Sequence, residues 1–147
     1  GWNANVDWLQ RGDHLDVNFS GPLGVGSARV AGTPARLEVH TTEGEHFVTT
    51  DPENDLYWQL GWTAPLDRMA DWVLGIPAPG GQPALEIDGA GRLVQLVQDG
   101  WTVDYIDYLR LDNERILPRK IEIRSENVRI RLIVSDWTLS KAGSGER

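Results

Sequence analysis

Apolar and polar residues alternate along most of this sequence, and turn residues interrupt the alternation every eight to twelve positions. The first segment places an apolar side chain at every second position: Trp2, Ala4, Val6 and Trp8. After a turn at residues 10–13 the same period returns with Leu15, Val17 and Phe19. Because successive side chains of a β-strand point to opposite faces, this pattern predicts a hairpin with one apolar face.

The alternation continues through several further short segments. Apolar positions recur near residues 28–30, 37–39, 47–49, 85–87, 92–97, 101–105, 121–123 and 130–134. Asp99 and Gly100 separate two of these segments, and an Asp-Gly pair is a specific sequence for a two-residue hairpin turn. The sequence therefore predicts roughly nine or ten antiparallel strands in one meandering sheet.

Two short segments in the middle of the chain, residues 54–60 and 66–74, have helical spacing instead. The second has apolar residues at positions i, i+3, i+4, i+7 and i+8: Leu66, Met69, Ala70, Val73 and Leu74. Pro65 suits the first turn of this helix, and Gly75 suits its C-terminal end. We predict two helices that interrupt the strand pattern once.

A long sheet with one apolar face must cover that face. Two short helices are too few to cover ten strands as a flat layer, whereas a curled sheet covers part of its own face. We therefore predict a mainly β (α+β) fold, in which a single curved antiparallel sheet forms an unclosed β-barrel and the inserted helices form a lid. The interior is either a hydrophobic cavity or a core filled by its own side chains, and the pattern leaves both interpretations open.

Length and charge limit the number of domains and the kinds of partner. The 147 residues suit one domain, which we place at residues 1–139, followed by a disordered tail at residues 140–147. The formal net charge of −8 argues against a nucleic-acid surface and against binding of anionic lipid through basic residues. No segment has the length of a transmembrane helix. Strand alternation starts at once, so we expect further residues upstream in the natural chain.

No arrangement of residues predicts an enzyme, a metal site or a cofactor. The histidines at positions 14, 40 and 46 match no zinc-binding spacing, and we interpret them as solvated surface residues. The glycines at positions 21–26 lack the lysine and the following serine or threonine of a phosphate-binding loop. Cysteine is absent, which excludes disulfides and thiol chemistry in this chain.

Two pairs of carboxylates keep one enzymatic alternative open. Asp104 with Asp107, or Asp112 with Glu114, could supply the acid and base of a glycoside hydrolase. The separation between two carboxylates cannot be checked from sequence, and a solvated surface is the more common role for such residues. A glycoside hydrolase is therefore retained only as a minor alternative.

The loop at residues 21–28 carries apolar side chains where its turn residues predict contact with water. Pro22 cannot donate a strand hydrogen bond, and the neighbouring glycines favour a turn, so the loop is expected to protrude from the sheet. Leu23 then needs an apolar surface to contact, unless it folds back over the end of the sheet. The candidate contact residues are Pro22, Leu23, Gly24 and Val25.

Five stretches of the sequence resemble a known family in order and in spacing. They lie at residues 7–10, 21–24, 64–77, 100–105 and 129–137, and they extend over nearly the whole chain. The most specific is the run from Pro-Leu to Trp-Val-Leu-Gly-Ile-Pro within residues 64–77. These motifs resemble those of the outer-membrane lipoprotein receptor LolB family.

The resemblance implies an unclosed barrel with a helical lid that holds the acyl chains of lipoproteins. Family members receive lipoproteins from a soluble periplasmic carrier of similar fold, LolA, and insert them into the inner leaflet of the outer membrane. The resemblance also implies that Leu23 contacts this membrane. It further implies an anchor at the periplasmic face of the outer membrane, through an N-terminal lipidated cysteine that this sequence does not contain.

We expect the acyl chains to contact side chains of the inner strand faces and the lid. These residues are Trp8, Leu15, Val17, Phe19, Leu66, Met69, Val73, Trp101, Val103, Ile130 and Leu132. The chain is expected to act as a monomer. Two alternatives stay open: a soluble LolA-like carrier without a receptor role, and a binding module for small hydrophobic molecules. A lipidated cysteine upstream in the natural chain would favour the receptor over both.

Overall fold

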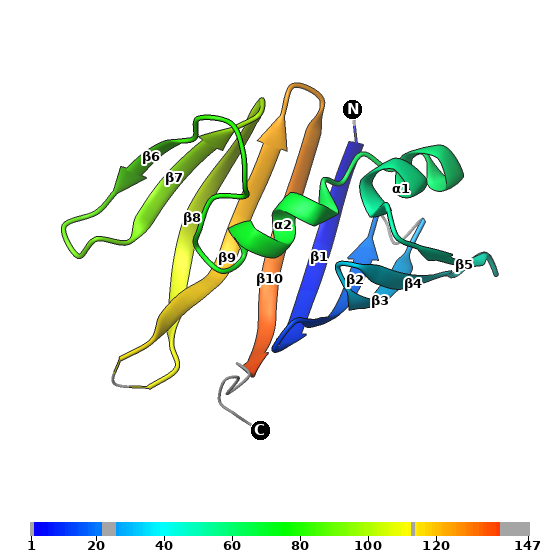
Figure 1. The fold of residues 1–147 in the computed structure, drawn as a ribbon, viewed down its shortest axis with the longest axis horizontal. Coiled ribbons are helices and arrows are strands. Elements are labelled where there is room, and N and C mark those ends of the chain that lie inside the picture. The colour runs from blue at the N-terminus through cyan, green and yellow to red at the C-terminus, as the bar shows by residue number, and fades with distance from the viewer. Residues whose placement is uncertain (1, 22–25, 113, 139–147) are drawn as a thin grey trace.

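The computed structural model describes residues 2–21, 26–112 and 114–138, which form one ten-stranded sheet and two helices (Figure 1). The first five strands are β1 (Trp2–Arg11), β2 (His14–Ser20), β3 (Ala28–Thr33), β4 (Arg36–Thr41) and β5 (His46–Thr49). The helices follow as α1 (Pro52–Leu60) and α2 (Leu66–Trp72). The last five strands are β6 (Ala84–Ile87), β7 (Leu93–Gln98), β8 (Trp101–Arg110), β9 (Ile116–Ser125) and β10 (Val128–Thr138).

The sheet consists of two five-stranded meanders that meet at the first and last strands of the chain. Its strand order is β5-β4-β3-β2-β1-β10-β9-β8-β7-β6, and β5 and β6 are its two edges. The sheet is not closed into a barrel, so the predicted curled sheet with inserted helices is confirmed for the described residues. Every neighbouring pair within each meander is antiparallel.

The prediction of an entirely antiparallel sheet was wrong at one place. β1 pairs with β10 in parallel, from Trp2 opposite Val128 to Arg11 opposite Thr138, so the sheet is mixed. A bulge between Trp8 and Leu9 shifts the register within this pair. Side chains alternate with period two in both kinds of pairing, so the sequence pattern carries no information on strand direction.

The two faces of the sheet differ in what covers them. We call the face that packs against the helices the inner face, and the opposite face the outer face (Figure 1). The inner face carries rows of buried apolar residues across neighbouring strands, such as Val39, Val30, Val17 and Trp8. Burying one such side chain contributes about 1.5–3 kcal/mol, so these rows specify which face turns inward.

The turns and helix ends agree with the sequence expectations apart from small shifts. Asp99 and Gly100 have φ angles of 54° and 83°, as the predicted two-residue hairpin turn requires. Helix α1 begins at Pro52, two residues before the predicted start, and α2 ends at Trp72, two residues before the predicted end. Gly61, with a φ of 71°, ends α1 in the left-handed conformation that glycine adopts without strain.

Candidate functional site

The structure brings together the eleven residues predicted to contact acyl chains. They come from β1, β2, β8, β10, α2 and the residue after α2, and all belong to one hydrophobic cluster or pack against it. Ten of them are at most 1% exposed, and Trp101 is half-buried beside Trp72. The inner face and the segment that contains both helices, residues 52–73, therefore share one continuous apolar layer. We call residues 52–73 the helical segment.

This apolar layer is closely packed in the structure. Leu66, Met69 and Val73 are at most 1% exposed, so neighbouring atoms cover their side chains completely. Of the two interpretations that the sequence left open, the described residues adopt the filled interior. A ligand can enter this layer only where helix and sheet separate.

Helix α2 is held to the C-terminal meander by buried hydrogen bonds. Trp72 Nε1 donates to Gln98 Oε1 at 2.9 Å, and Ala78 N donates to the same oxygen at 3.0 Å. Gln98 Nε2 in turn donates to the carbonyl oxygens of Ala78, at 2.7 Å, and Gly80, at 3.2 Å. Gln98 is 2% exposed, so water does not compete for these bonds.

A tyrosine of β8 fixes the same end of α2. The Tyr105 hydroxyl donates to the carbonyl oxygen of Trp72 at 2.6 Å, and burial raises the pKa of Tyr105. Its ring stacks on Tyr108, whose hydroxyl donates to the carbonyl oxygen of Leu93 at 2.6 Å. Burial raises the pKa of Tyr108 to about 12, so both phenols stay protonated donors at neutral pH.

Helix α1 is attached by fewer polar contacts. Arg68 of α2 lies 3.3 Å from Glu53 of α1 and 3.2 Å from Asp99 in the turn between β7 and β8. The Thr49 hydroxyl donates to Asp55 at 2.6 Å, which joins the start of α1 to β5. These ion pairs are partly exposed, so they are screened by solvent and contribute little each.

The linker between α1 and α2 combines apolar packing with an unpaired polar group. Trp62 is buried, and its ring lies 5.3 Å from that of Phe19 on β2. The hydroxyl oxygen of Thr63 is buried and has no hydrogen-bond partner among the described residues. A buried hydroxyl without a partner is costly, so this linker is less firmly held than the Gln98 network.

The predicted membrane-contacting loop, Pro22, Leu23, Gly24 and Val25, lies outside the described residues. Its neighbours place it between the end of β2 and the start of β3, in the N-terminal meander. On α1, Tyr57 is 49% and Trp58 is 76% exposed, and their rings meet edge to face at 5.2 Å. No helix in the described ranges is both long and apolar enough to cross a bilayer.

Three of the four carboxylates considered for glycoside hydrolysis form ion pairs with arginines. Asp104 lies 3.0 Å from Arg124, and Asp107 lies 3.3 Å from an arginine of β9. Asp112 lies 2.7 Å from Arg115, and this hydrogen bond lowers the pKa of Asp112 to about 2. A carboxyl group with a pKa this low cannot act as a general acid, so Asp112 does not suit that role, and the ion pairs of Asp104 and Asp107 fit a solvated, structural role.

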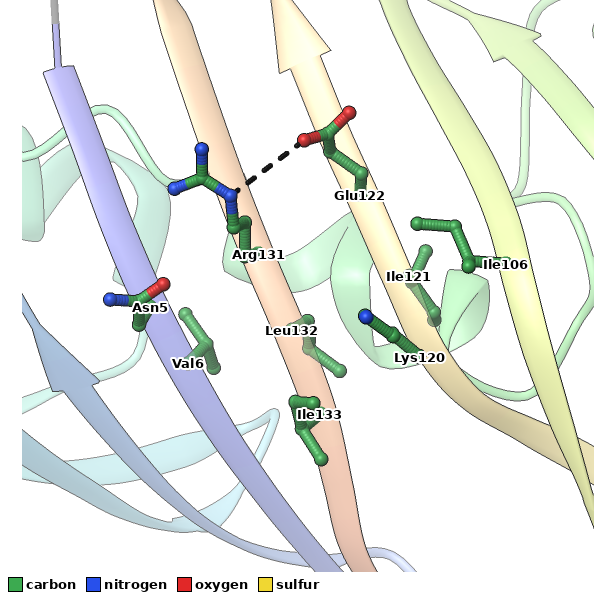
Figure 2. Close-up of a pocket in the computed structure, with 9 residues that line it drawn as sticks. All are labelled: Asn5, Val6, Ile106, Lys120, Ile121, Glu122, Arg131, Leu132 and Ile133. Atoms are coloured by element: carbon green, nitrogen blue, oxygen red, sulfur yellow. Dashed lines mark ion pairs between the residues drawn. The ribbon is translucent and has the colours of Figure 1, made fainter.

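A pocket of about 410 Å³, which the sequence pattern does not indicate, lies on the outer face. Figure 2 shows it with the helices behind the sheet, and its exposed apolar members are Ile106 and Ile133. Arg131 and Glu122, 3.9 Å apart, lie on neighbouring strands beside Lys120. Ile106 points outward as alternation from the buried Val103 and Tyr105 requires, and a bulge between Tyr105 and Asp107 then shifts the pairing of β8 with β9.

A second cluster missed by the sequence analysis lies at the β5 edge. His40 and His46 face each other across β4 and β5, with ring centroids 4.1 Å apart and an angle of 13° between the rings. Glu38 lies on the same outer face, and its Oε1 is 3.9 Å from His40 Nε2. A hairpin register centred on residue 43 would have placed the two histidines opposite each other.

Comparisons with known proteins agree with the residue motifs. A family model described as "Outer membrane lipoprotein LolB" matches residues 1–137. An outer-membrane lipoprotein LolB of Pseudomonas savastanoi pv. phaseolicola is 38% identical over 141 residues, which span 96% of this chain and 68% of that relative. Proteins of the same name from Pseudomonas putida and Stutzerimonas stutzeri match with the same identity and coverage. The chain therefore belongs to the outer membrane lipoprotein LolB family.

Proposed function

We propose that this protein localises lipoproteins to the outer membrane by holding their acyl chains between the inner face of its sheet and its helical segment. The observation that carries the proposal is the single apolar layer in which all eleven candidate residues meet. An acyl chain loses contact with water only on an apolar surface of this extent. An unclosed sheet can also widen without breaking a closed ring of strand pairs.

Membership of the LolB family supports this role. Members of the family are lipoprotein localisation factors and not enzymes, in line with the expectation from sequence. The family match also favours the receptor over a LolA-like carrier or a general binding module for hydrophobic molecules. The protein acts as a monomer in this proposal, because one chain supplies both the sheet and the helices.

The acyl chains enter, in this proposal, between the N-terminal meander and the segment formed by α1 and its linker. Trp62 and Phe19 lose apolar contacts when this segment moves away from the sheet, and acyl chains replace them with other apolar contacts. The hydrogen bonds from Trp72 to Gln98 have no substitute in an acyl chain. Helix α2 therefore stays on the C-terminal meander while α1 moves.

Acyl chains must pass directly from one apolar site to the next. Each buried methylene contributes about 0.8 kcal/mol, so burial of three acyl chains contributes a gross hydrophobic free energy on the order of tens of kcal/mol. We propose a LolA-like periplasmic carrier as the donor and the inner leaflet of the outer membrane as the acceptor. The net charge of −8 would attract a carrier whose docking surface is basic.

The membrane step is assigned to Pro22, Leu23, Gly24 and Val25 on sequence grounds. A leucine buried in lipid contributes only about 1.5–3 kcal/mol, which is too little to anchor a protein. It is enough to favour a transient contact in which the loaded site opens toward the bilayer. Such a contact suits delivery of cargo.

Site-specific photocrosslinking tests the acyl-chain site. Trp101 is half-buried and aromatic, so benzoylphenylalanine at this position conserves bulk and shape, and Ile106 on the outer face provides the matched control. The protein is loaded with an acyl-labelled lipoprotein from the carrier and irradiated. We expect crosslinks to the acyl chains from position 101 and none from position 106. Absent crosslinks at 101, or equal crosslinks at both positions, would contradict the proposal.

A further inference from the structure

We propose that Glu38, His40 and His46 form a binding site for a divalent transition-metal ion, such as Zn²⁺, at the β5 edge of the sheet. One ligand atom from each residue lies within 4.8 Å of the ligand atoms of the other two. Two imidazole nitrogens and a carboxylate oxygen suit Zn²⁺, Ni²⁺ or Cu²⁺, whereas Mg²⁺ and Ca²⁺ prefer oxygen ligands.

Strand pairing brings the three residues together. Glu38 and His40 are two residues apart on β4, so both point to the outer face, while Leu37 and Val39 between and beside them are fully buried. His46 begins β5 and lies directly opposite His40 in the ladder. The backbone positions of all three ligands are thus fixed by sheet hydrogen bonds, and only side-chain rotation separates this cluster from a metal site.

The required movement is small. Zn²⁺ holds nitrogen and oxygen ligands at about 2.0–2.2 Å, so tetrahedral ligand atoms lie about 3.4 Å apart. Glu38 Oε1 and His40 Nε2 are 3.9 Å apart, and about half of each side chain is exposed and free to turn. The stacked rings must rotate so that a nitrogen lone pair from each points to a common centre, and both histidines are exposed to solvent.

Neighbouring charges permit a cation at this position. Arg29 is opposite His40 on β3, but its guanidinium is held by both carboxylate oxygens of Asp16, at 2.7 and 2.8 Å. Glu43 and Glu45 lie in the turn between β4 and β5 and add negative charge near the cluster. Arg36, two residues before Glu38 on the same face of β4, is the other basic neighbour, so Glu38, Glu43 and Glu45 outnumber the basic charge that Asp16 does not neutralise.

Metal binding would have a consequence for the helical segment. The ion would join the edge strand β5 to β4, and β5 leads within two residues into α1. Thr49 at the end of β5 accepts a hydrogen bond from Asp51 N at 2.9 Å and donates to Asp55. Zn²⁺ would thus restrain the point from which α1 departs, independently of any acyl chain.

The test is a titration of the EDTA-treated protein with ZnCl₂, followed by amide NMR. We expect saturation at one ion per chain, shifts centred on residues 38–48, and slower amide hydrogen exchange in β5. His40→Asn and His46→Asn are each expected to weaken binding about tenfold or more, because each removes one of three protein ligands. His14→Asn removes the remaining histidine, on β2, and is the matched control.

The unmodified protein decides the question even if a variant folds poorly. Shifts centred on residues 38–48 in the unmodified chain, together with weaker binding by the His46→Asn variant, support the site. The absence of saturable binding, shifts centred elsewhere, or an equal loss of affinity in His14→Asn would overturn it. Amide spectra recorded without zinc verify that each variant keeps the native fold.

Discussion

The two meanders of the sheet hold the helical segment in different ways. The C-terminal meander uses directional polar contacts: Gln98 binds Trp72 and Ala78, and Tyr105 binds the carbonyl oxygen of Trp72. The N-terminal meander holds the segment by apolar packing, such as the contact between Phe19 and Trp62, and by one partly buried side-chain hydrogen bond, from Thr49 to Asp55 at the start of α1. The C-terminal half therefore fixes α2 by buried hydrogen bonds, and the N-terminal half covers the linker between the helices mainly with apolar side chains.

A buried glutamine occurs in each meander, and the two differ in how far along the chain their hydrogen-bond partners lie. Gln10 accepts a hydrogen bond from Trp8 Nε1 at 2.9 Å and donates to the carbonyl oxygen of Gly12. Those partners are two residues away in the chain, so the network stabilises only its own hairpin. The partners of Gln98 lie 18 to 26 residues away, in α2 and in the loop that follows it.

The largest expected effect is on the insertion of lipoproteins into a membrane, which we assign to the N-terminal meander and not to the C-terminal one. Leu23→Glu, in the loop of the N-terminal meander, is expected to lower lipoprotein insertion about tenfold or more, because a carboxylate is expelled from the bilayer. Loading with lipoprotein and thermal stability should stay near normal. The measurement is transfer of lipoprotein from the preloaded protein to liposomes.

Leu85→Glu provides the matched control for this variant. Leu85 is 52% exposed on the edge strand β6 of the C-terminal meander. The same change in charge and volume at this position should leave insertion intact. Normal insertion by the Leu23 variant, or equal losses in both variants, would contradict a membrane role confined to the N-terminal loop.

The next effect concerns the polar anchor of α2. Gln98→Ala leaves Trp72 Nε1 and both backbone groups of Ala78 without partners, and we expect the free energy of unfolding to fall by about 3 kcal/mol. Gln10→Ala leaves one buried indole nitrogen unpaired and should cost about 1 kcal/mol. Urea denaturation of the two variants measures this difference. Equal losses of stability would remove the distinction between the two meanders.

Much of the fold could be predicted because the alternation of apolar residues reports directly on burial. The inner-face residues Val17, Val103 and Ile130 were assigned correctly from period two alone. The parallel pairing of β1 with β10 could not be found, since parallel and antiparallel strands share that period. Pairing between the two ends of a chain depends on topology and leaves no local sequence pattern.

The candidate site was predicted less completely than the fold. The helical stripe through Leu66, Met69 and Val73 identified apolar residues of the lid, but it omitted Trp72, which is fully buried. Burial of Trp72 depends on a hydrogen-bond partner 26 residues away, Gln98, which helical spacing does not indicate. The cluster of His40 and His46 was missed because a linear spacing rule takes no account of strand pairing.

A smaller effect tests the link between the two helices. Arg68→Gln removes the ion pairs to Glu53 and Asp99, and we expect a loss of at most about 1 kcal/mol, because these groups are partly exposed. Amide exchange should accelerate in α1 and stay unchanged in α2, which keeps its bonds to Gln98. Hydrogen exchange followed by NMR measures both helices at once.

Arg29→Gln is the control for the Arg68 variant. It breaks an ion pair of 2.7 Å with Asp16 within the N-terminal meander, and that pair includes no helical residue. Exchange in both helices should stay at the level of the unmodified protein. Equal acceleration of α1 and α2 in Arg68→Gln would show that α2 is not held independently.

The smallest expected effect concerns two carboxyl groups whose pKa values are shifted in opposite directions. Burial, with smaller contributions from Glu53 and Asp51, raises the pKa of Asp67 at the start of α2. In the N-terminal meander, the hydrogen bond from Arg29 lowers the pKa of Asp16. The folded state thus binds a proton more tightly than the unfolded state at Asp67, and less tightly at Asp16.

These opposite shifts predict opposite responses to pH. Ionisation of Asp67 destabilises the folded protein, so its contribution to stability falls as pH rises from the ordinary aspartate pKa of 3.8 through the raised value. Protonation of Asp16 destabilises the folded protein, so its contribution falls as pH drops from 3.8 through the lowered value. At pH 7, Asp67→Asn should therefore stabilise the protein and Asp16→Asn should destabilise it, each by less than about 0.5 kcal/mol because solvent screens both groups. For Asp67→Asn the difference should vanish near pH 3, where both variant and parent are neutral at this position. Urea unfolding at pH 3 and pH 7 measures the two signs, and a stabilising Asp16→Asn or a pH-independent Asp67→Asn would contradict the assignment.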